Sequence, residues 1–238
     1  MRLLGTVRPG VADALTLGNA SCGVGATLVV VTLGTGGDAL RLVVVLLLAG
    51  TVLDVLDGAA ARRWGSSSLG RPLDGLADAV TFGLMPAVAL GALGLDGDPG
   101  VAAVAVVAGV VIFSGSALLR LADFCATRCG DPHFTGLPSP LAAVAAFDIA
   151  FLSPPPLVIA LGLAGLGAQM VSPLHYPVQG GVIAALSLGG WAFGAAGLSG
   201  LVDARIPALA TLAFIVVVIP TATAIEVRSR VPVNAPTC

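Results

Sequence analysis

Four aspartates stand close together in DVLDGAAARRWGSSSLGRPLDGLAD, residues 54–78 of an otherwise apolar chain. Asp54 and Asp57 are three residues apart and Asp74 and Asp78 are four apart, so each pair lies on one face of a helix. The short polar loop between the two helices predicts antiparallel neighbours, on which all four carboxylates can converge. Four close anions repel each other and lose hydration, and a divalent cation relieves both penalties. All-oxygen ligands suit Mg²⁺, Mn²⁺ or Ca²⁺ rather than zinc.

The residues around these aspartates suit a ligand that carries phosphate. Gly58 and Gly70 have no side chain and Ala61 has only a methyl group, which lets a bulky polar ligand approach the backbone. Arg62 supplies a cation suited to phosphate. A purely structural alternative makes the aspartates helix caps and interface residues that neighbouring arginines balance. Because acids inside membrane helices are costly and usually functional, we favour a metal-plus-phosphate site.

The elements that position this stretch are membrane helices. The chain of 238 residues is 57% hydrophobic and 10% charged, with a mean hydropathy of +1.02. Since a helix needs about 20 apolar residues to cross a bilayer, we expect an all-α membrane protein, a polytopic bundle of about eight transmembrane helices. The expected spans are 11–33, 39–61, 72–95, 100–123, 138–152, 156–172, 179–198 and 206–226. The net charge of −2 argues against a nucleic-acid partner.

The arginines orient these spans. If both termini are cytoplasmic, only Arg41 and Arg205 fall on the outer side of the membrane. The remaining arginines fall on or near the inner side, which is a strong positive-inside bias: Arg2, Arg8, Arg62, Arg63, Arg71, Arg120, Arg128, Arg228 and Arg230. We therefore expect a multi-pass protein of the cell membrane, with residues 54–78 at its cytoplasmic face.

The aspartate stretch resembles the signature of the CDP-alcohol phosphatidyltransferases, DxxDGxxAR…GxxxDxxxD. The matching positions are Asp54, Asp57, Gly58, Ala61, Arg62, Gly70, Asp74 and Asp78. The loop between Arg62 and Gly70 is one residue shorter than is usual in that family. The resemblance implies that the four aspartates hold a two-metal centre of Mg²⁺ or Mn²⁺ and that Asp78 is also the general base. It further implies that Gly58, Ala61, Arg62 and Gly70 line the CDP pocket.

Other segments resemble the phosphatidylserine synthase branch of this family. They are LTLGNASCG (15–23), VTFGLMPA (80–87), LLRLADF (118–124), HFTGLPSPLAA (133–143) and MVSPLHYP (170–177). The resemblance implies one integral-membrane domain over residues 1–238, with extra C-terminal spans at about 179–226, and a homodimer. It implies transfer of the lipid-bearing phosphoryl group from CDP-diacylglycerol or CDP-archaeol to the hydroxyl of L-serine, with release of CMP.

Several polar residues outside the signature are candidates for ligand contacts. Arg120, near the cytoplasmic end of the fourth span, suits the serine carboxylate, although a snorkelling arginine is the alternative. Thr135 and Ser139 flank the start of the fifth span, where they could contact phosphate or serine or cap the helix. Thr16 and Asn19 lie within the first span. The resemblance places them near the nucleotide, whereas buried polar residues in membrane helices usually bond to a neighbouring helix.

Two alternatives to a serine transferase remain open. The same chemistry with glycerol phosphate or an inositol phosphate as acceptor would require additional basic residues beside the site, and few arginines are available. An ion-coupled transporter would use the acidic cluster differently, but such proteins carry internal repeats and midplane sites. We see no repeat here, and the cluster lies at the edge of the membrane.

Overall fold

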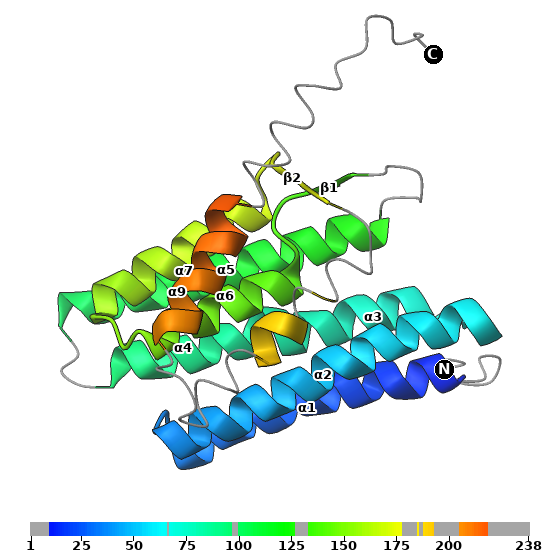
Figure 1. Ribbon diagram of the computed structural model, residues 1–238, viewed down its shortest axis with the longest axis horizontal. Helices are drawn as coiled ribbons and strands as arrows, with labels where there is room; N and C mark the ends of the chain where they lie inside the picture. The colour runs from blue at the N-terminus through cyan, green and yellow to red at the C-terminus, as the bar shows by residue number, and fades with distance from the viewer. Residues whose placement is uncertain are drawn as a thin grey trace, which may run out of the picture.

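The computed structural model describes residues 10–65, 67–96, 100–126, 133–177, 185, 188–192 and 205–218. The chain is helical over most of this part (Figure 1). Two long helices come first, α1 (Val11–Leu33) and α2 (Gly37–Trp64). A continuous helical run follows, composed of α3 (Gly70–Asp78), the π-helix η1 (Ala79–Leu84) and α4 (Met85–Leu95). The later elements are α5 (Val101–Ala126), β1 (His133–Thr135), α6 (Ser139–Phe151), α7 (Pro156–Met170), β2 (His175–Pro177), α9 (Arg205–Ala213) and η2 (Phe214–Val218).

Four of these helical stretches are long and apolar enough to cross a membrane: Val11–Leu33, Gly37–Trp64, Gly70–Leu95 and Val101–Ala126. The chain is therefore a multi-pass helical membrane protein, as its composition predicted. The expected fifth and sixth spans form the shorter apolar helices α6 and α7. Most of the expected seventh span, and the end of the eighth, lie outside the described residues, so the expected total of about eight spans stays a prediction.

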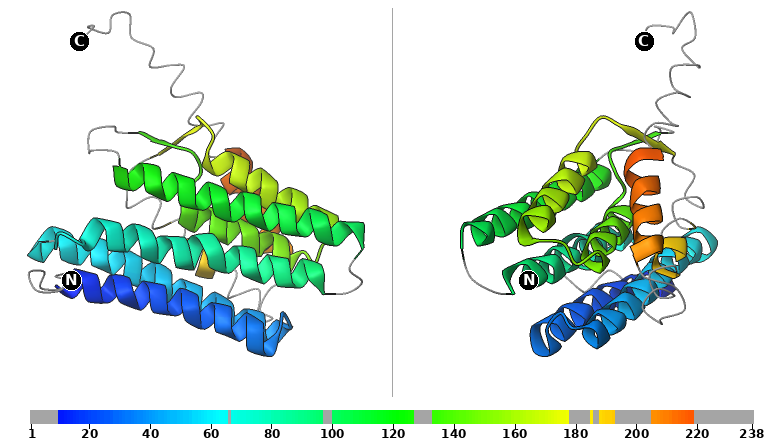
Figure 2. Two further views of the ribbon diagram at one scale, coloured as in Figure 1. Left: turned by 180° about the vertical axis from the view of Figure 1, so that it is seen from behind. Right: turned by 60° about the vertical axis from the view of Figure 1, so that its left-hand side comes forward.

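The bundle has two pairs of closely packed helices with the Gly70–Leu95 run between them. The helices α1 and α2 pack along each other on one side, and α5 and α7 do so on the other (Figure 2). The run from α3 to α4 contacts both α1 and α5. Glycines permit the closest approaches, because a Cβ atom on Gly109 of α5 would lie 2.7 Å from the Ala160 carbonyl oxygen of α7. Small residues at such crossings are typical of packed membrane helices.

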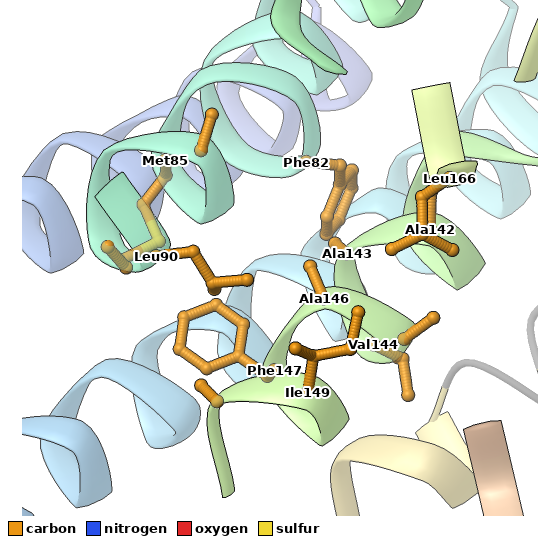
Figure 3. Packing of buried hydrophobic residues seen from close by; sticks show 14 of the residues in the cluster. Phe82, Met85, Leu90, Ala142, Ala143, Val144, Ala146, Phe147, Ile149 and Leu166 are labelled. Carbon is orange, nitrogen blue, oxygen red and sulfur yellow. The ribbon is translucent and has the colours of Figure 1, made fainter. Parts of the chain in front are cut away.

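The apolar core is centred on α6, whose residues Leu141–Ala150 are all buried. Figure 3 shows Phe82 of η1 pointing toward Ala143 and Leu90 of α4 lying over Phe147. Trp191 packs edge-on against Phe147 with their ring centroids 5.6 Å apart. This core fixes η1 and α4 against α6, and so it fixes the position of α3 immediately before them.

Two features differ from the expected loops and spans. The segments of residues 133–135 and 175–177 pair as antiparallel strands, with Phe134 opposite Tyr176. Sequence patterns did not predict this pairing, because three-residue strands carry no usable periodicity. Asp148, to which the sequence assigned no role, is buried in α6 and accepts a 2.6 Å hydrogen bond from the Thr211 hydroxyl of α9. It therefore connects α6, at the centre of the apolar core, to α9.

Candidate active site

The acidic site lies at one end of the bundle, where α2 ends and α3 begins. Asp54, Asp57 and Asp74 each offer a carboxylate oxygen, and these three oxygens lie within 4.8 Å of one another. Gly65 follows α2 with a positive φ of 85°, which glycine adopts readily, and donates its N–H to the Ala61 carbonyl as the helix ends. The chain then returns as α3 after only a few residues, and both α2 and α3 pack against α1, so their carboxylates converge on one point.

Asp78 adjoins the three-carboxylate group from one turn further along α3. Its side chain interacts directly with that of Asp54. It also accepts a 3.2 Å hydrogen bond from the Asn19 amide of α1. The wider turn of η1 begins at the next residue, and π-turns of this kind occur frequently at functional sites. All four signature aspartates are therefore gathered in one region.

The first helix contributes more to this site than the sequence patterns indicated. The Thr16 hydroxyl donates a 2.6 Å hydrogen bond to Oδ2 of Asp57, 41 residues away in the chain. Thr16 and Asn19 are both buried, with exposed fractions of 3% and 0%. Because their donors meet the carboxylates of α2 and α3, α1 lies directly behind the acidic cluster.

Asp13 is a site residue that sequence reasoning missed. It is buried in the first turn of α1, where its carboxylate accepts hydrogen bonds from the Gly10 N–H at 2.7 Å and from the Ser67 hydroxyl at 2.9 Å. Its charge also acts on Asp57. Asp13, Thr16 and Asn19 recur every three residues, so they form one polar stripe on an apolar helix. That spacing was the signal that could have identified Asp13.

The residues expected to line a nucleotide pocket lie in the last two turns of α2 and at the start of α3. Arg62 is exposed in the last turn of α2, while Gly58, Ala61 and Gly70 are half-buried. A Cβ atom on Gly58 would lie 3.4 Å from a guanidinium nitrogen of Arg62. The absence of a side chain at Gly58 therefore leaves room beside that cation. This arrangement suits an anionic ligand that enters from the end of the bundle.

The remaining candidates lie where α5 meets the start of α6. Arg120 donates from Nε to the Leu137 carbonyl at 2.8 Å, which joins the end of α5 to the segment before α6. Ser139 is 3% exposed, and its hydroxyl has no hydrogen-bond partner among the described residues. The same end of α5 reaches α3, since Arg71 donates to the Phe124 carbonyl at 2.8 Å. The side chain of Thr135 lies outside the described part of the structure.

A sequence model of the CDP-alcohol phosphatidyltransferase family matches residues 10–171. The chain belongs to this family. The match runs from α1 through α7 and contains the whole acidic site, whereas α9 and η2 lie beyond it. A CDP-alcohol phosphatidyltransferase acts on a substrate that carries phosphate groups. The small residues and the arginine around the aspartates are the surroundings that such a substrate requires.

The curated relatives of this phosphatidyltransferase include CDP-diacylglycerol–serine O-phosphatidyltransferases and an archaetidylserine synthase. The chain is 33% identical over 135 residues to the CDP-diacylglycerol–serine O-phosphatidyltransferase of Bacillus subtilis, covering 56% of this chain and 73% of that protein. It is 29% identical over 172 residues to the archaetidylserine synthase of Methanothermobacter thermautotrophicus, covering 69% and 68%. A CDP-diacylglycerol–serine O-phosphatidyltransferase of Mycobacterium leprae matches at 38% over 114 residues, covering 44% and 36%.

The donor set of the acidic site fits a divalent cation. Oxygens that bind one Mg²⁺ lie about 3.0 Å apart when adjacent and about 4.2 Å apart when opposite, so three oxygens within 4.8 Å of one another are close enough to converge on one ion after side-chain adjustment. All the donors are carboxylate oxygens, which hard cations prefer. The two helices that carry them are joined by a short loop and packed against α1, so the set is largely formed in advance. The residues present therefore suit Mg²⁺ or Mn²⁺.

Proposed function

We propose that this phosphatidyltransferase transfers the phosphatidyl or archaetidyl group of a CDP-linked lipid to the hydroxyl of L-serine and releases CMP. The observation that carries the proposal is the convergence of Asp54, Asp57 and Asp74, within 4.8 Å, at the end of the bundle. The names of the relatives support serine as the acceptor and leave both lipid backbones as donors.

The four signature aspartates share the role of metal ligands in this proposal. Asp54, Asp57, Asp74 and Asp78 would hold Mg²⁺ or Mn²⁺ in a two-metal centre. Bound metal would neutralise the charge of the diphosphate and of the departing CMP. Phosphoryl transfer depends mainly on positioning and charge stabilisation, so the value of the scaffold lies in holding these carboxylates rigidly.

The nucleotide would lie against the ends of α2 and α3. Gly58, Ala61 and Gly70 would allow the CDP moiety to approach the helix backbones, and exposed Arg62 would pair with a phosphate. The lipid chains would then extend along the apolar exterior of the bundle. This arrangement explains why a hydrophobic donor and a water-soluble acceptor meet at the membrane surface.

Asp78 is the proposed general base. It would take the proton of the serine hydroxyl as that oxygen forms a bond to the lipid-bearing phosphorus. The bond from that phosphorus to the bridging oxygen of the diphosphate breaks, and CMP leaves with the electron pair. The hydrogen bond from Asn19 leaves Asp78 with further lone pairs for this task.

The acceptor would be held between α5 and the start of α6. Arg120 would supply the cation for the serine carboxylate, and it donates to the carbonyl of Leu137, two residues before Ser139. The buried Ser139 hydroxyl has a donor and lone pairs to offer to a polar ligand. Thr135 is a further candidate from the same segment. The chain has only eleven basic residues, and a phosphorylated acceptor would require several of them beside the site, which favours serine.

The proposed location of the site is the cytoplasmic face. The last turn of α2 carries Arg62 and Arg63, and Arg71 and Arg120 lie at the ends of α3 and α5 near the same site. Cations are favoured on the cytoplasmic side of membrane proteins. Family resemblance adds a homodimer in which each subunit has its own active site.

The test is a transfer assay with radiolabelled serine and purified protein in detergent. CDP-diacylglycerol and CDP-archaeol would be supplied in parallel, with Mn²⁺, Mg²⁺ or chelator, and CMP would be measured in the same samples. We expect metal-dependent label in the lipid fraction with an equal amount of CMP. The variant Asp74→Asn should lose both signals. Asp38→Asn is the matched control, because Asp38 is exposed on the same α2 helix as Asp54 but at its opposite end.

Other outcomes separate the alternatives. Release of CMP with glycerol phosphate or an inositol phosphate, but not with serine, would overturn the serine assignment and leave the donor chemistry intact. No CMP release with any acceptor or CDP-lipid would overturn transferase activity as a whole. The ratio of product from the two CDP-lipids identifies the preferred lipid backbone.

A further inference from the structure

We propose that α1 is a positioning helix, in which Thr16 and Asn19 orient the metal-binding carboxylates of Asp57 and Asp78 rather than bind the nucleotide. Thr81 and the glycines Gly23 and Gly50 fix Asn19 in this role. The inference rests on the proposed function to the extent that the acidic cluster holds a divalent cation. It does not depend on which alcohol is the acceptor.

The hydrogen bonds of Thr16 and Asn19 are already directed at the cluster. The Thr16 hydroxyl reaches Asp57 at 2.6 Å, and the Asn19 amide nitrogen reaches Asp78 at 3.2 Å. Both residues are at least 97% buried, so a nucleotide would have to displace helix packing to reach them. A carboxylate has about four lone-pair sites, and one accepted hydrogen bond therefore leaves it able to bind a metal.

The orientation of the Asn19 amide is fixed by chemistry and by packing. If its nitrogen and oxygen were exchanged, two acceptors, the amide oxygen and the Asp78 carboxylate, would face each other. In the observed orientation the amide oxygen lies toward α2, 3.0 Å from where a Cβ atom on Gly50 would stand. That oxygen has no hydrogen-bond partner among the described residues. The space beside Gly50, which has no side chain, therefore holds the amide oxygen. The amide nitrogen then faces Asp78 and donates to it.

A second contact ties α1 to the helix turn that follows Asp78. The Thr81 hydroxyl of η1 donates to the Asn19 backbone carbonyl at 3.0 Å. A Cβ atom on Gly23 would lie 2.6 Å from that hydroxyl and 2.7 Å from the Thr81 Cα, so only glycine permits this approach. Thr81 follows Asp78 by three residues on the same helical run. The Asn19–Asp78 hydrogen bond is therefore held from both of its ends.

Groups that orient metal ligands have a measurable effect on metal affinity. Removing such a partner typically weakens metal binding or activity by about 10- to 100-fold, because the ligand is no longer held in one orientation. A residue that binds the nucleotide would instead change the affinity for CMP or the KM for the CDP-lipid. A residue with a purely structural role would change thermal stability and leave metal affinity unaltered.

The experiment compares two threonines of α1. Thr16→Val removes the hydroxyl that donates to Asp57 at 2.6 Å and also lies 3.0 Å from the Ala12 carbonyl. Thr27→Val is the matched control, because that hydroxyl donates to the Gly23 carbonyl four residues earlier in the same helix. Thr16→Ser restores the donor, and Thr81→Val tests the support of Asn19. For each purified full-length protein, Mn²⁺ affinity is measured by electron paramagnetic resonance without substrate, and CMP affinity is measured by calorimetry at saturating Mn²⁺.

We expect Thr16→Val to weaken Mn²⁺ binding by about 10-fold or more, with CMP affinity at saturating Mn²⁺ close to that of the unmodified protein. Thr16→Ser should recover most of the loss, Thr81→Val should resemble Thr16→Val, and Thr27→Val should have little effect. Unchanged Mn²⁺ affinity in Thr16→Val, or a selective loss of CMP affinity, would overturn the inference. An unmodified protein that binds no Mn²⁺ would overturn the metal centre and this inference together. Mn²⁺ binding without serine transfer would overturn only the choice of acceptor.

Discussion

The Ser67 hydroxyl donates a 2.9 Å hydrogen bond to the buried carboxylate of Asp13, which joins the loop between the two aspartate-bearing helices to the start of α1. The same hydroxyl accepts the Leu69 N–H at 3.1 Å, so it also shapes the turn into α3. The loop that sets the distance between α2 and α3 is therefore anchored to a third helix. This contact brings together residues 54 positions apart in the chain.

Replacing Ser67 with alanine should loosen this anchor. We expect Ser67→Ala to lower the free energy of unfolding by about 1–2 kcal/mol, because a buried acceptor loses its donor. Mn²⁺ affinity should fall as well, since the loop no longer holds α3 in one position. Thermal unfolding in detergent and Mn²⁺ titration are the measurements. Ser68→Ala is the control, because Ser68 is exposed in the same loop; equal behaviour of the two variants would contradict the anchor.

Replacing Asp78 with asparagine should abolish transfer while the protein remains folded. The amide cannot accept the serine proton, and loss of a general base typically costs about 10²–10⁴-fold in rate. The measurement is the turnover number at saturating serine and CDP-lipid over a wide range of Mn²⁺. A variant that lost only metal affinity would recover at high Mn²⁺, whereas loss of the base would persist. Near-normal turnover in Asp78→Asn would show that another group is the base.

Two glycines of α1 should respond oppositely to substitution by alanine. In Gly23→Ala the new methyl group would collide with Thr81, and overpacking of this kind costs about 1–3 kcal/mol. In Gly25→Ala the methyl group would lie 3.7 Å from Leu46, an ordinary contact. This second variant should keep its stability or gain about 0.5–1 kcal/mol, because alanine favours the helix. Melting temperatures of both variants give the test, and a stable Gly23→Ala would show that α1 and η1 can separate without cost.

Substitution of Arg120 by lysine should affect the acceptor selectively. Lysine retains the charge but lacks the planar fork that binds a carboxylate through two hydrogen bonds. We expect the KM for serine to rise by about 10-fold, which corresponds to about 1.4 kcal/mol, while the KM for the CDP-lipid is unchanged. Arg63→Lys, at the exposed end of α2, is the control. A parallel rise in both KM values would indicate that Arg120 supports the whole site through Leu137 instead.

Substitution of Thr211 by valine tests the connection between the core and the C-terminal helix. The variant removes the 2.6 Å donor to the buried Asp148 carboxylate, which should destabilise the protein by about 1–3 kcal/mol. Thr211→Ser keeps the hydroxyl and should behave like the unmodified protein. Because the contact is between α6 and α9, Mn²⁺ affinity below the melting temperature should not change. A fall in metal affinity would show that α9 influences the acidic site.

The membrane character of the chain and the two carboxylate pairs follow from the amino-acid sequence alone. Continuous apolar runs of about 20 residues have the length of membrane-spanning helices, which satisfy their own backbone hydrogen bonds in a bilayer. Helical periodicity then places Asp54 beside Asp57 and Asp74 beside Asp78, whatever the rest of the fold does. A short loop returns the chain near the end of α2, and so the signature predicted the three-carboxylate group that the structure contains.

Which groups of other helices meet these carboxylates depends on how the helices pack in three dimensions. The contacts of Thr16 with Asp57, Asn19 with Asp78 and Ser67 with Asp13 depend on the rotation and the axial position of α1 relative to its neighbours. Periodicity along one helix contains no information about that register. The register between helices is set by the side chains that interlock and by positions without a side chain, such as Gly23 where it meets Thr81. These contacts can be evaluated only when both helices are in place.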